Sequence, residues 1–164
     1  MTKPSPVTTI VSGAQTGADQ GGLAAGRTLG LLTAGWVPKD RRTDTGPLTD
    51  EQMKRYHLRE TVSTDYRERT RLNVQSADGT VWFGSRDSAG YYCTRQAAKY
   101  NYGLTWSWRD HWNENPTPTE LREWVIKNHI VILNVAGNRE RINRGIGKHT
   151  YDTLCDALLE ENND

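Results

Sequence analysis

The sequence predicts one α/β domain, in which helices cover both faces of a mostly parallel sheet of about five strands. Short apolar runs alternate along the chain with longer amphipathic segments, a pattern typical of repeated strand–helix units. The chain has 164 residues, which is about the size of one domain. We therefore expect residues 1–164 to fold as a single unit with three layers.

The composition is that of a folded protein. Leu, Ile, Val and Phe make up about 18% of the residues, slightly below the roughly 20% that marks disordered chains when the net charge is also high. Here the net charge is only +1, and six Trp and seven Tyr residues add apolar volume. The near-neutral charge argues against general nucleic-acid binding. A mean hydropathy of −0.79, without an apolar run of about 18 residues, argues against a membrane span.

The first six residues are polar and lack the apolar stretch of a signal peptide. We therefore expect a cytoplasmic protein, and we also expect a homo-oligomer. Cys93 and Cys155 lie one each in apparently helical segments, without metal-binding spacing. We interpret both as reduced core residues, with a redox or metal role as the alternative.

The first quarter of the chain predicts a strand, a tight loop and a helix. Residues 8–11 are mostly β-branched, residues 12–17 carry two glycines, and residues 18–29 form an alanine-rich amphipathic segment. Residues 33–36 predict a short second strand. Residues 37–57 are polar and rich in turn residues, longer than most connections in a compact domain, so we interpret them as a functional loop.

The middle of the chain repeats the alternation. Residues 65–75 predict a helix, residues 79–83 a strand and residues 88–100 a further helix. The spacing within this last helix places four residues on one face: Ala89, Cys93, Ala97 and Tyr100. Residues 104–108 are a possible strand.

The last third gives the clearest signals. Residues 117–120 combine a capping-box spacing with proline at the first helical position, which predicts a helix through residue 127 with Leu121, Trp124 and Val125 facing inward. Residues 130–135 are continuously apolar, as in a strand buried on both faces of a parallel sheet. Apolar residues then recur at helical spacing at Tyr151, Leu154, Cys155 and Leu158. The whole pattern is that of a Rossmann-like layered fold.

In open parallel sheets, ligands bind beyond the carboxyl ends of the strands, so the loops after the three clearest strands are the candidate site. The loop at 12–17 offers glycines, hydroxyl groups and a helix N-terminus, which suit a phosphate, although a plain tight connection is the alternative. The loop at 84–90 is similar, and Asp87 or Ser88 could simply cap a helix. The loop at 136–141 brings two arginines, whose forked side chains bind phosphate but often lie unpaired at a surface. Together the three loops predict an anionic ligand.

Two further clusters of cations add charge. They are Lys39, Arg41 and Arg42 in the long loop, and Arg67, Arg69 and Arg71 in a predicted helix. At helical spacing Arg67 and Arg71 share one side, so we expect at least one of them to be solvated surface. Trp106, Trp108 and Trp112 flank His111 and could form a shelf for a base or pterin ring, or pack over a loop.

Catalytic and metal-binding patterns are weak. The chain contains neither HExxH nor GxSxG, and its four histidines are scattered. Asp19 and Glu140 are the carboxylates nearest the candidate site, and either could act as a base or hold a ribose hydroxyl. Asp19 could instead cap a helix. We assign no catalytic and no metal-binding residue.

Five motifs, taken in order, resemble the putative molybdenum carrier family. They are SGAQTGAD at 12–19, GWVPKDRR at 35–42, YRERT at 66–70 with Asn73 and Val74, SADGT at 76–80, and LNVAG at 133–137 with Arg139 and Glu140. The resemblance runs from about residue 10 to residue 151. That family is similar to the molybdenum cofactor carrier proteins and belongs to the Rossmann-like SLOG superfamily, so the resemblance implies this fold.

The resemblance also implies a pocket for a nucleotide or a phosphorylated pterin. It would be formed by the loop at 12–17, the segment 39–42, the loop ending at Thr94 and the turn at 137–140. With the loop analysis above, the candidate ligand-binding residues are Gly13, Ala14, Gln15, Thr16, Gly17, Asp19, Lys39, Arg42, Ser85, Gly90, Thr94, Gly137, Asn138, Arg139 and Glu140.

The sequence departs from the family pattern near the implied ligand. Ala14 stands where a second glycine is usual, and Gln20 where an arginine is common. Residues 89–94 keep only part of the family's glycine-rich phosphate loop, and residues 106–108 replace its acidic strand end. The PGGxGT motif and downstream glutamate of the phosphoribohydrolase members are absent, which argues against that activity.

We therefore predict a protein that binds a phosphorylated small molecule without turning it over. The ligand would be a molybdopterin-type cofactor, as in a carrier, or a nucleotide signal such as a cyclic ADP-ribose, as in a sensor or sequestering protein. The alternative is a hydrolase that cleaves an N-glycosidic or phosphate bond of a nucleotide, with one of the two carboxylates as base. We expect Arg139, with Lys39 or Arg42, to contact the phosphate, and Arg67 and Arg71 to matter less.

Overall fold

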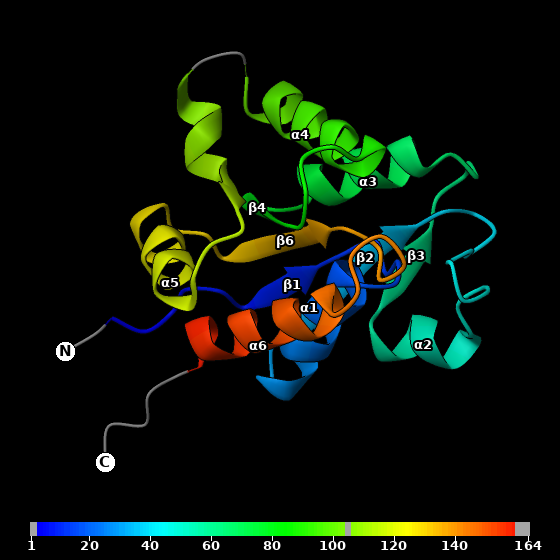
Figure 1. Ribbon diagram of the computed structural model, residues 1–164, viewed down its shortest axis with the longest axis horizontal. Coiled ribbons are helices and arrows are strands. Elements are labelled where there is room, and N and C mark those ends of the chain that lie inside the picture. Colours follow the sequence, from blue (N-terminus) through cyan, green and yellow to red (C-terminus); the bar gives the residue numbers. More distant parts are fainter. Residues whose placement is uncertain (1–2, 104–105, 160–164) are drawn as a thin grey trace.

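The computed structural model describes residues 3–103 and 106–159 as one α/β domain (Figure 1). Its strands are β1 (Thr9–Val11), β2 (Leu32–Val37), β3 (Leu58–Glu60), β4 (Gly79–Phe83), β5 (Trp112–Glu114) and β6 (Ile132–Gly137). Its helices are α1 (Ala18–Thr28), α2 (Asp50–Arg55), α3 (Tyr66–Gln75), α4 (Ala89–Tyr102), the 3₁₀ helix η1 (Trp106–His111), α5 (Pro118–Lys127) and α6 (Ile146–Leu158). None of these helices is both long and apolar enough to cross a membrane.

The six strands form one all-parallel sheet in the order β3-β2-β1-β6-β4-β5. The last strand of the chain therefore lies at the centre of the sheet. Thr9 of β1 pairs with Ile132 of β6, and Val81 of β4 pairs with Val135 on the other side of β6. The prediction of a Rossmann-like sheet is confirmed, with six strands where about five were expected.

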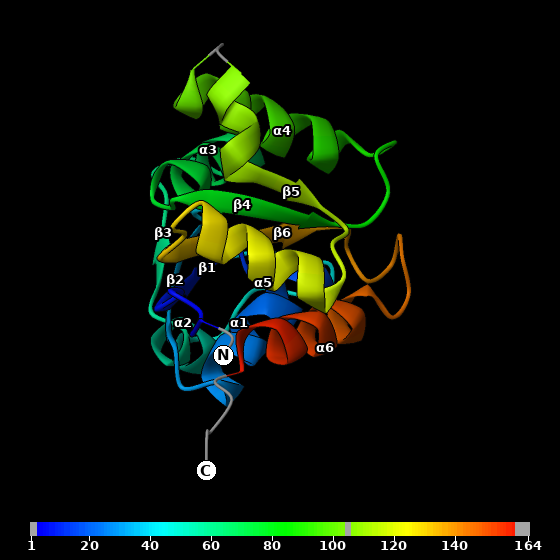
Figure 2. The same cartoon turned by 90° about the vertical axis from the view of Figure 1, so that its left-hand side faces the viewer.

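Helices cover the sheet on both faces, which confirms the three layers. Helices α1, α5 and α6 lie on one face, and α3 and α4 on the other (Figures 1 and 2). The first face buries a core in which Ile10, Leu133 and Leu154 are fully inaccessible to solvent. On the opposite face Trp82 packs edge-on against Tyr91 at 5.4 Å between ring centroids.

Side-chain caps fix where the helices begin, because the first backbone N–H groups of a helix have no partner within it. Thr117 and Glu120 form the predicted capping box at the start of α5. Asp65 accepts a hydrogen bond from Arg67 N at the start of α3. Of the two residues proposed as caps of α4, Ser88 fills that role, since its Oγ accepts from Tyr91 N.

The short edge strands were the main error of the sequence analysis. The expected strand at 104–108 falls partly outside the described residues, and the rest of it belongs to η1; the true edge strand follows at Trp112–Glu114. Helix α2 lies within the expected polar loop, and strand β3, directly after that loop, was not predicted. Helix α2 begins with a second capping box, formed by Thr49 and Gln52, whose Thr-x-x-Gln spacing was present in the sequence.

The buried face of α4 also differs from the predicted one. Tyr91, Thr94 and Ala98 point inward, whereas Tyr100, which was expected on the inner face, is 83% exposed. The apolar stripe was misjudged because the aromatic core under α4 is filled by Tyr91 rather than by small residues. Cys93 and Cys155 are both free thiols, as expected, at half-buried positions, and Cys155 packs against the core.

Candidate functional site

The loop between β1 and α1 folds around the side chain of Asp19. The Gln15 backbone N–H donates to Asp19 Oδ2 at 3.2 Å, and Ser12 Oγ donates to the Asp19 carbonyl oxygen at 3.1 Å. Gly17 is the N-cap of α1, and no side chain caps that helix, so Asp19 closes the loop instead of capping. Ala14 has φ +60°, a left-handed conformation that glycine adopts at less cost.

Glycines let the loops after β1 and β6 come into contact. A Cβ atom on Gly17, where φ is +84°, would lie 2.6 Å from Glu140 N, and one on Gly137 would lie 2.5 Å from Ala18 Cβ. Without these atoms, the Ala18 N–H reaches the Asn138 carbonyl oxygen at 3.2 Å. The two loops therefore form one continuous floor at the carboxyl edge of the sheet.

Asn138 joins this floor to the loop after β4. Its side chain is buried, its Oδ1 accepts from Ser85 N at 2.7 Å, and its backbone N–H donates to the Phe83 carbonyl at 2.9 Å. Its Nδ2 lies 3.4 Å from Ser88 Oγ, the cap of α4. Asn138 thus fixes the first turn of α4 relative to the floor.

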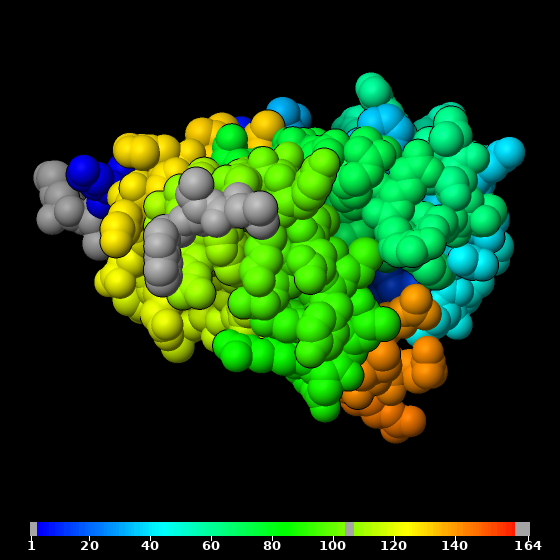
Figure 3. Space-filling view, turned by 90° about the horizontal axis from the view of Figure 1, so that it is seen from above, coloured from blue at the N-terminus to red at the C-terminus, as the bar shows by residue number. Residues whose placement is uncertain are grey.

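A cavity of about 550 Å³ lies above the floor, within the usual range for small-molecule sites. In Figure 3 it is a hollow between the green surface of α3 and α4 and the orange loop after β6, with blue atoms at its base. Its wall residues are Gln15 and Asp19; Tyr66, Arg67, Arg69 and Thr70; Trp82; Ser88, Ala89, Gly90, Cys93 and Thr94; and Ala136, Gly137, Asn138, Arg139, Arg141 and Ile142.

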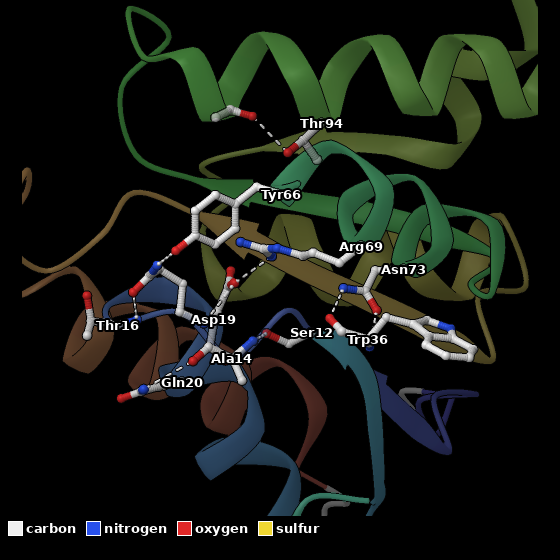
Figure 4. Close-up of polar contacts among 12 residues, drawn as sticks. Ser12, Ala14, Thr16, Asp19, Gln20, Trp36, Tyr66, Arg69, Asn73 and Thr94 are labelled. Carbon is white, nitrogen blue, oxygen red and sulfur yellow. Dashed lines mark hydrogen bonds and ion pairs between the residues drawn. The ribbon is translucent and has the colours of Figure 1, made fainter. Parts of the chain in front are cut away.

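A buried ion pair crosses the cavity floor. Arg69 on α3 places its Nη1 atom 3.3 Å from Asp19 Oδ2 (Figure 4), and the two side chains are 13% and 6% exposed. Gly13 makes room, because a Cβ atom there would collide with the Arg69 guanidinium. Burial raises the pKa of Asp19 above its usual value, and the charge of Arg69 and the Gln15 N–H oppose that rise only in part.

Three arginines gather around the ring of Tyr66 beside the cavity. The guanidinium carbons of three arginines lie 4.7, 5.2 and 5.2 Å from the centre of its ring; these are Arg42, Arg69 and Arg139. At such distances the negative face of an aromatic ring attracts a cation. The ring therefore offsets part of the repulsion among three positive charges and keeps them close together.

Arg139 and Arg141 also share one carboxylate from the long loop. Asp44 Oδ1 lies 2.6 Å from Arg139 Nη1, and Asp44 Oδ2 lies 3.3 Å from Arg141 Nε. The Asp44 backbone N–H donates to Gln15 Oε1 at 2.9 Å. The long loop thus reaches the rim of the cavity through Asp44, in addition to the contact of Arg42 with the Tyr66 ring.

The predicted ligand-binding residues fall into two groups. Those that line the cavity are Gln15, Asp19, Gly90, Thr94, Gly137, Asn138 and Arg139. The rest lie around it. Gly13 and Ala14 lie under the floor, and a separate groove between α1 and α6 holds Thr16, Gly17 and Glu140. Ser85 contacts Asn138, Arg42 contacts the ring of Tyr66, and Lys39 is exposed in the long loop.

The sequence analysis missed the inner face of α3. Tyr66 and Arg69 line the cavity, and Asn73, one turn further, is buried and bonded to the Trp36 backbone. Residues at 66, 69 and 73 share one face at helical spacing, and this was the available signal. The side chain of Arg67 is 81% exposed, as expected, yet the residue is part of the cavity lining, and its guanidinium pairs with Asp65.

Backbone hydrogen bonds hold the carboxylate of Glu140 in place. Its carboxylate accepts from Gly145 N at 2.6 Å and from Gly147 N at 3.0 Å, and these backbone hydrogen bonds lower its pKa. Both donors belong to the start of α6, so Glu140 neutralises that helix end. Its carboxylate is therefore already engaged, in contrast to a free base.

Two of the three tryptophans, Trp108 and Trp112, follow the packing alternative, and the side chain of Trp106 lies outside the described part of the structure. Trp108 and Trp112 are buried beneath α4, and His111 stacks on Tyr102 with 4.3 Å between ring centres. Within residues 3–103 and 106–159, no group of three His, Cys, Asp or Glu side chains is placed to hold a metal ion.

Comparison with known proteins agrees with this architecture. The crystal structure of a putative molybdenum carrier protein from Syntrophus aciditrophicus SB superposes with a TM-score of 0.80 and 26% sequence identity, covering 96% of this chain and 98% of that one. No curated protein sequence matches significantly. The model of the circularly permutated YpsA SLOG family matches residues 10–158. Because this match spans nearly the whole chain, the protein belongs to the circularly permutated YpsA SLOG family.

Proposed function

We propose that the cavity binds a phosphate-bearing ligand derived from a nucleotide or a pterin and releases it chemically unchanged. The observation that carries the proposal is that guanidinium groups and apolar side chains line the same cavity. Arg69, Arg139 and Arg141 contribute positive charge, and Trp82 and Ala136 contribute apolar surface. A phosphorylated heterocycle combines an anionic group with a flat apolar ring in the same way.

The start of α4 offers further binding groups for the anionic part of the ligand. Ala89 and Gly90 form its first turn at the cavity wall. Backbone N–H groups at such a position, together with the helix dipole, attract anions. The space beside Gly90 is open, since a Cβ atom there would meet nothing closer than Trp82 at 3.6 Å.

The apolar part of the lining suits a flat ring. Trp82 and Ala136 are paired residues of neighbouring strands, and Ile142 adds apolar surface from the loop after β6. A volume of about 550 Å³ accommodates a mononucleotide or a phosphorylated pterin, since drug-sized ligands occupy cavities of roughly 300–1,000 Å³. A pterin cofactor would enter here as cargo, in keeping with the name of the similar protein from Syntrophus aciditrophicus, a putative molybdenum carrier.

The engaged carboxylates favour binding over turnover. Glu140 caps α6, and Asp19 is paired with Arg69. The second candidate function, hydrolysis of a nucleotide, is favoured by one observation only: Asp19 is a buried carboxylate in the cavity wall with a raised pKa, as general bases often are. If the protein is a hydrolase, Asp19 rather than Glu140 is its base.

Calorimetric titration tests the proposal, with AMP, ADP, ADP-ribose and a phosphorylated pterin as probes. Chromatography of each mixture then shows whether the probe is recovered intact. We expect at least one probe to bind and to be recovered intact. If none binds, the proposal is wrong; if a bound probe is cleaved, the hydrolase alternative is correct.

Arg139→Ala locates the phosphate within the cavity. A charge-assisted hydrogen bond contributes about 1.5–3 kcal/mol, so the variant should bind the same probe roughly ten- to a hundredfold more weakly. Arg71→Ala is the matched control, because Arg71 is exposed on α3 and bonds only to Gln75 among the described contacts. Equal weakening by both variants, or none by Arg139→Ala, would place the ligand elsewhere.

A further inference from the structure

The carboxylate of Asp44 lies at the rim of the cavity, against two arginines of its wall. It contacts two guanidinium groups, those of Arg139 at 2.6 Å and Arg141 at 3.3 Å. Both arginines line the cavity. The Asp44 side chain is only 18% exposed, although the residue as a whole is exposed. A carboxylate between two guanidinium groups reproduces the charge and hydrogen-bonding pattern of a bound phosphate.

Asp44 is also what fastens the tip of the long loop to the domain. Residues 43–46 form a tight turn closed by hydrogen bonds between Thr43 and Gly46. Most of the turn is exposed to solvent. Its described polar contacts with the rest of the domain are those of Asp44, through the two arginines and through Gln15.

We propose that Asp44 is an internal anion that occupies the phosphate subsite, and that the ligand displaces it. This inference rests on the proposed function and specifies its regulation. When the phosphate binds, Arg139 and Arg141 exchange one anion for another, and the turn at 43–46 is released from the rim. Binding is therefore weaker than the arginines alone would allow, because only the released state accepts the ligand.

The opposite role makes the opposite prediction. If Asp44 merely held Arg139 in position for the ligand, its removal would weaken binding. If Asp44 competes with the ligand, its removal strengthens binding. The two roles are thus separated by the sign of one measured effect.

The experiment compares Asp44→Asn with Asp40→Asn by calorimetric titration with ADP and with pyrophosphate. The two substitutions remove the same charge from the same loop, but Asp40 contacts Arg42 and has no ion pair with Arg139 or Arg141 in the described part of the chain. Partly exposed ion pairs contribute modestly to stability, so we expect Asp44→Asn to bind about three- to tenfold more tightly than the unaltered protein. Asp40→Asn should stay within about twofold of it.

Hydrogen–deuterium exchange without ligand gives an independent measurement. We expect faster exchange at residues 43–46 in Asp44→Asn and unchanged exchange in Asp40→Asn. Unchanged exchange in Asp44→Asn, weaker binding by that variant, or equal tightening by both variants would overturn the inference and leave the proposed function intact. If neither ADP nor pyrophosphate binds the unaltered protein or Asp44→Asn, the competition is refuted, whereas the proposed function fails only if AMP, ADP-ribose and the phosphorylated pterin also fail to bind.

Discussion

Replacing Arg69 with methionine tests the electrostatics of the cavity floor directly. The substitution keeps a long apolar side chain on α3 but leaves Asp19, which is 5% exposed, without its counter-charge. Removing one partner of a buried ion pair costs about 3–5 kcal/mol. Asp19 keeps the Gln15 N–H, and the unpartnered Arg69 Nε atom is removed with the side chain. We therefore expect the lower end, about 3 kcal/mol.

The loss should shrink as the pH falls. Burial raises the pKa of Asp19 in the folded protein, and Arg69 limits that rise, so the pKa rises further in Arg69→Met. The folded state of the variant then binds a proton that the unfolded state has already released, and its stability falls as pH increases through this range. At acid pH, where Asp19 is protonated in both proteins, the missing charge of Arg69 has little to act on.

Urea unfolding of both proteins at pH 5 and at pH 7.5 measures this effect. At pH 7.5, a loss of about 3 kcal/mol corresponds to a decrease in Tm of roughly 6–12 °C for a domain of this size. Arg71→Met is the control, because Arg71 is exposed on the same helix and should cost less than about 0.5 kcal/mol. Equal losses for both variants, or the same loss for Arg69→Met at both pH values, would refute the reasoning.

Two further substitutions probe the loops that form the floor. Gly17→Ala should cost more than about 3 kcal/mol of stability. Positive φ costs a residue that has a Cβ atom roughly 1–2 kcal/mol, and the new Cβ would also collide with the backbone after β6. Gly30→Ala is the control: φ is also positive there, but a Cβ would meet nothing within 4 Å, so only the backbone cost should remain. Chemical denaturation compares them, and similar losses would mean that the loops do not pack closely. Glu140→Gln should cost about 1 kcal/mol at pH 7, as for a lost helix cap. The backbone hydrogen bonds lower the folded pKa of Glu140, so its contribution is present above the unfolded pKa and disappears as pH falls through the folded one; a difference in Tm that persists unchanged to pH 3 would contradict this.

The central strands and most of the helices could be predicted from the sequence because their signals are local. The apolar run that became β6 and the capping box before α5 each decide an element within a few residues. Strands β3 and β5 could not be recognised in this way, since each has three residues and lies at a sheet edge. Their pairing depends on neighbouring strands rather than on their own composition.

The site was predictable to the same degree. Loops that follow clear strands were placed correctly at one edge of the sheet, because parallel strands align their carboxyl ends. The inner face of α3 was not found, since Arg69 is buried only through Asp19, which lies 50 residues earlier, and no local pattern shows that partner. The floor and Arg139 therefore follow from the sequence pattern, whereas the contribution of α3 required the tertiary structure.

The position of β6 has a consequence for synthesis of the chain. Strands β1, β2 and β3 can pair as soon as they leave the ribosome, and β4 and β5 can pair later, but no strand joins the two groups until β6 emerges. Until then, β1 and β4 each present an unpaired edge, a state that invites association with other chains. A nascent polypeptide ending before residue 132 should therefore depend on chaperones, and a separately supplied peptide covering β6 and α6 should complement it in trans.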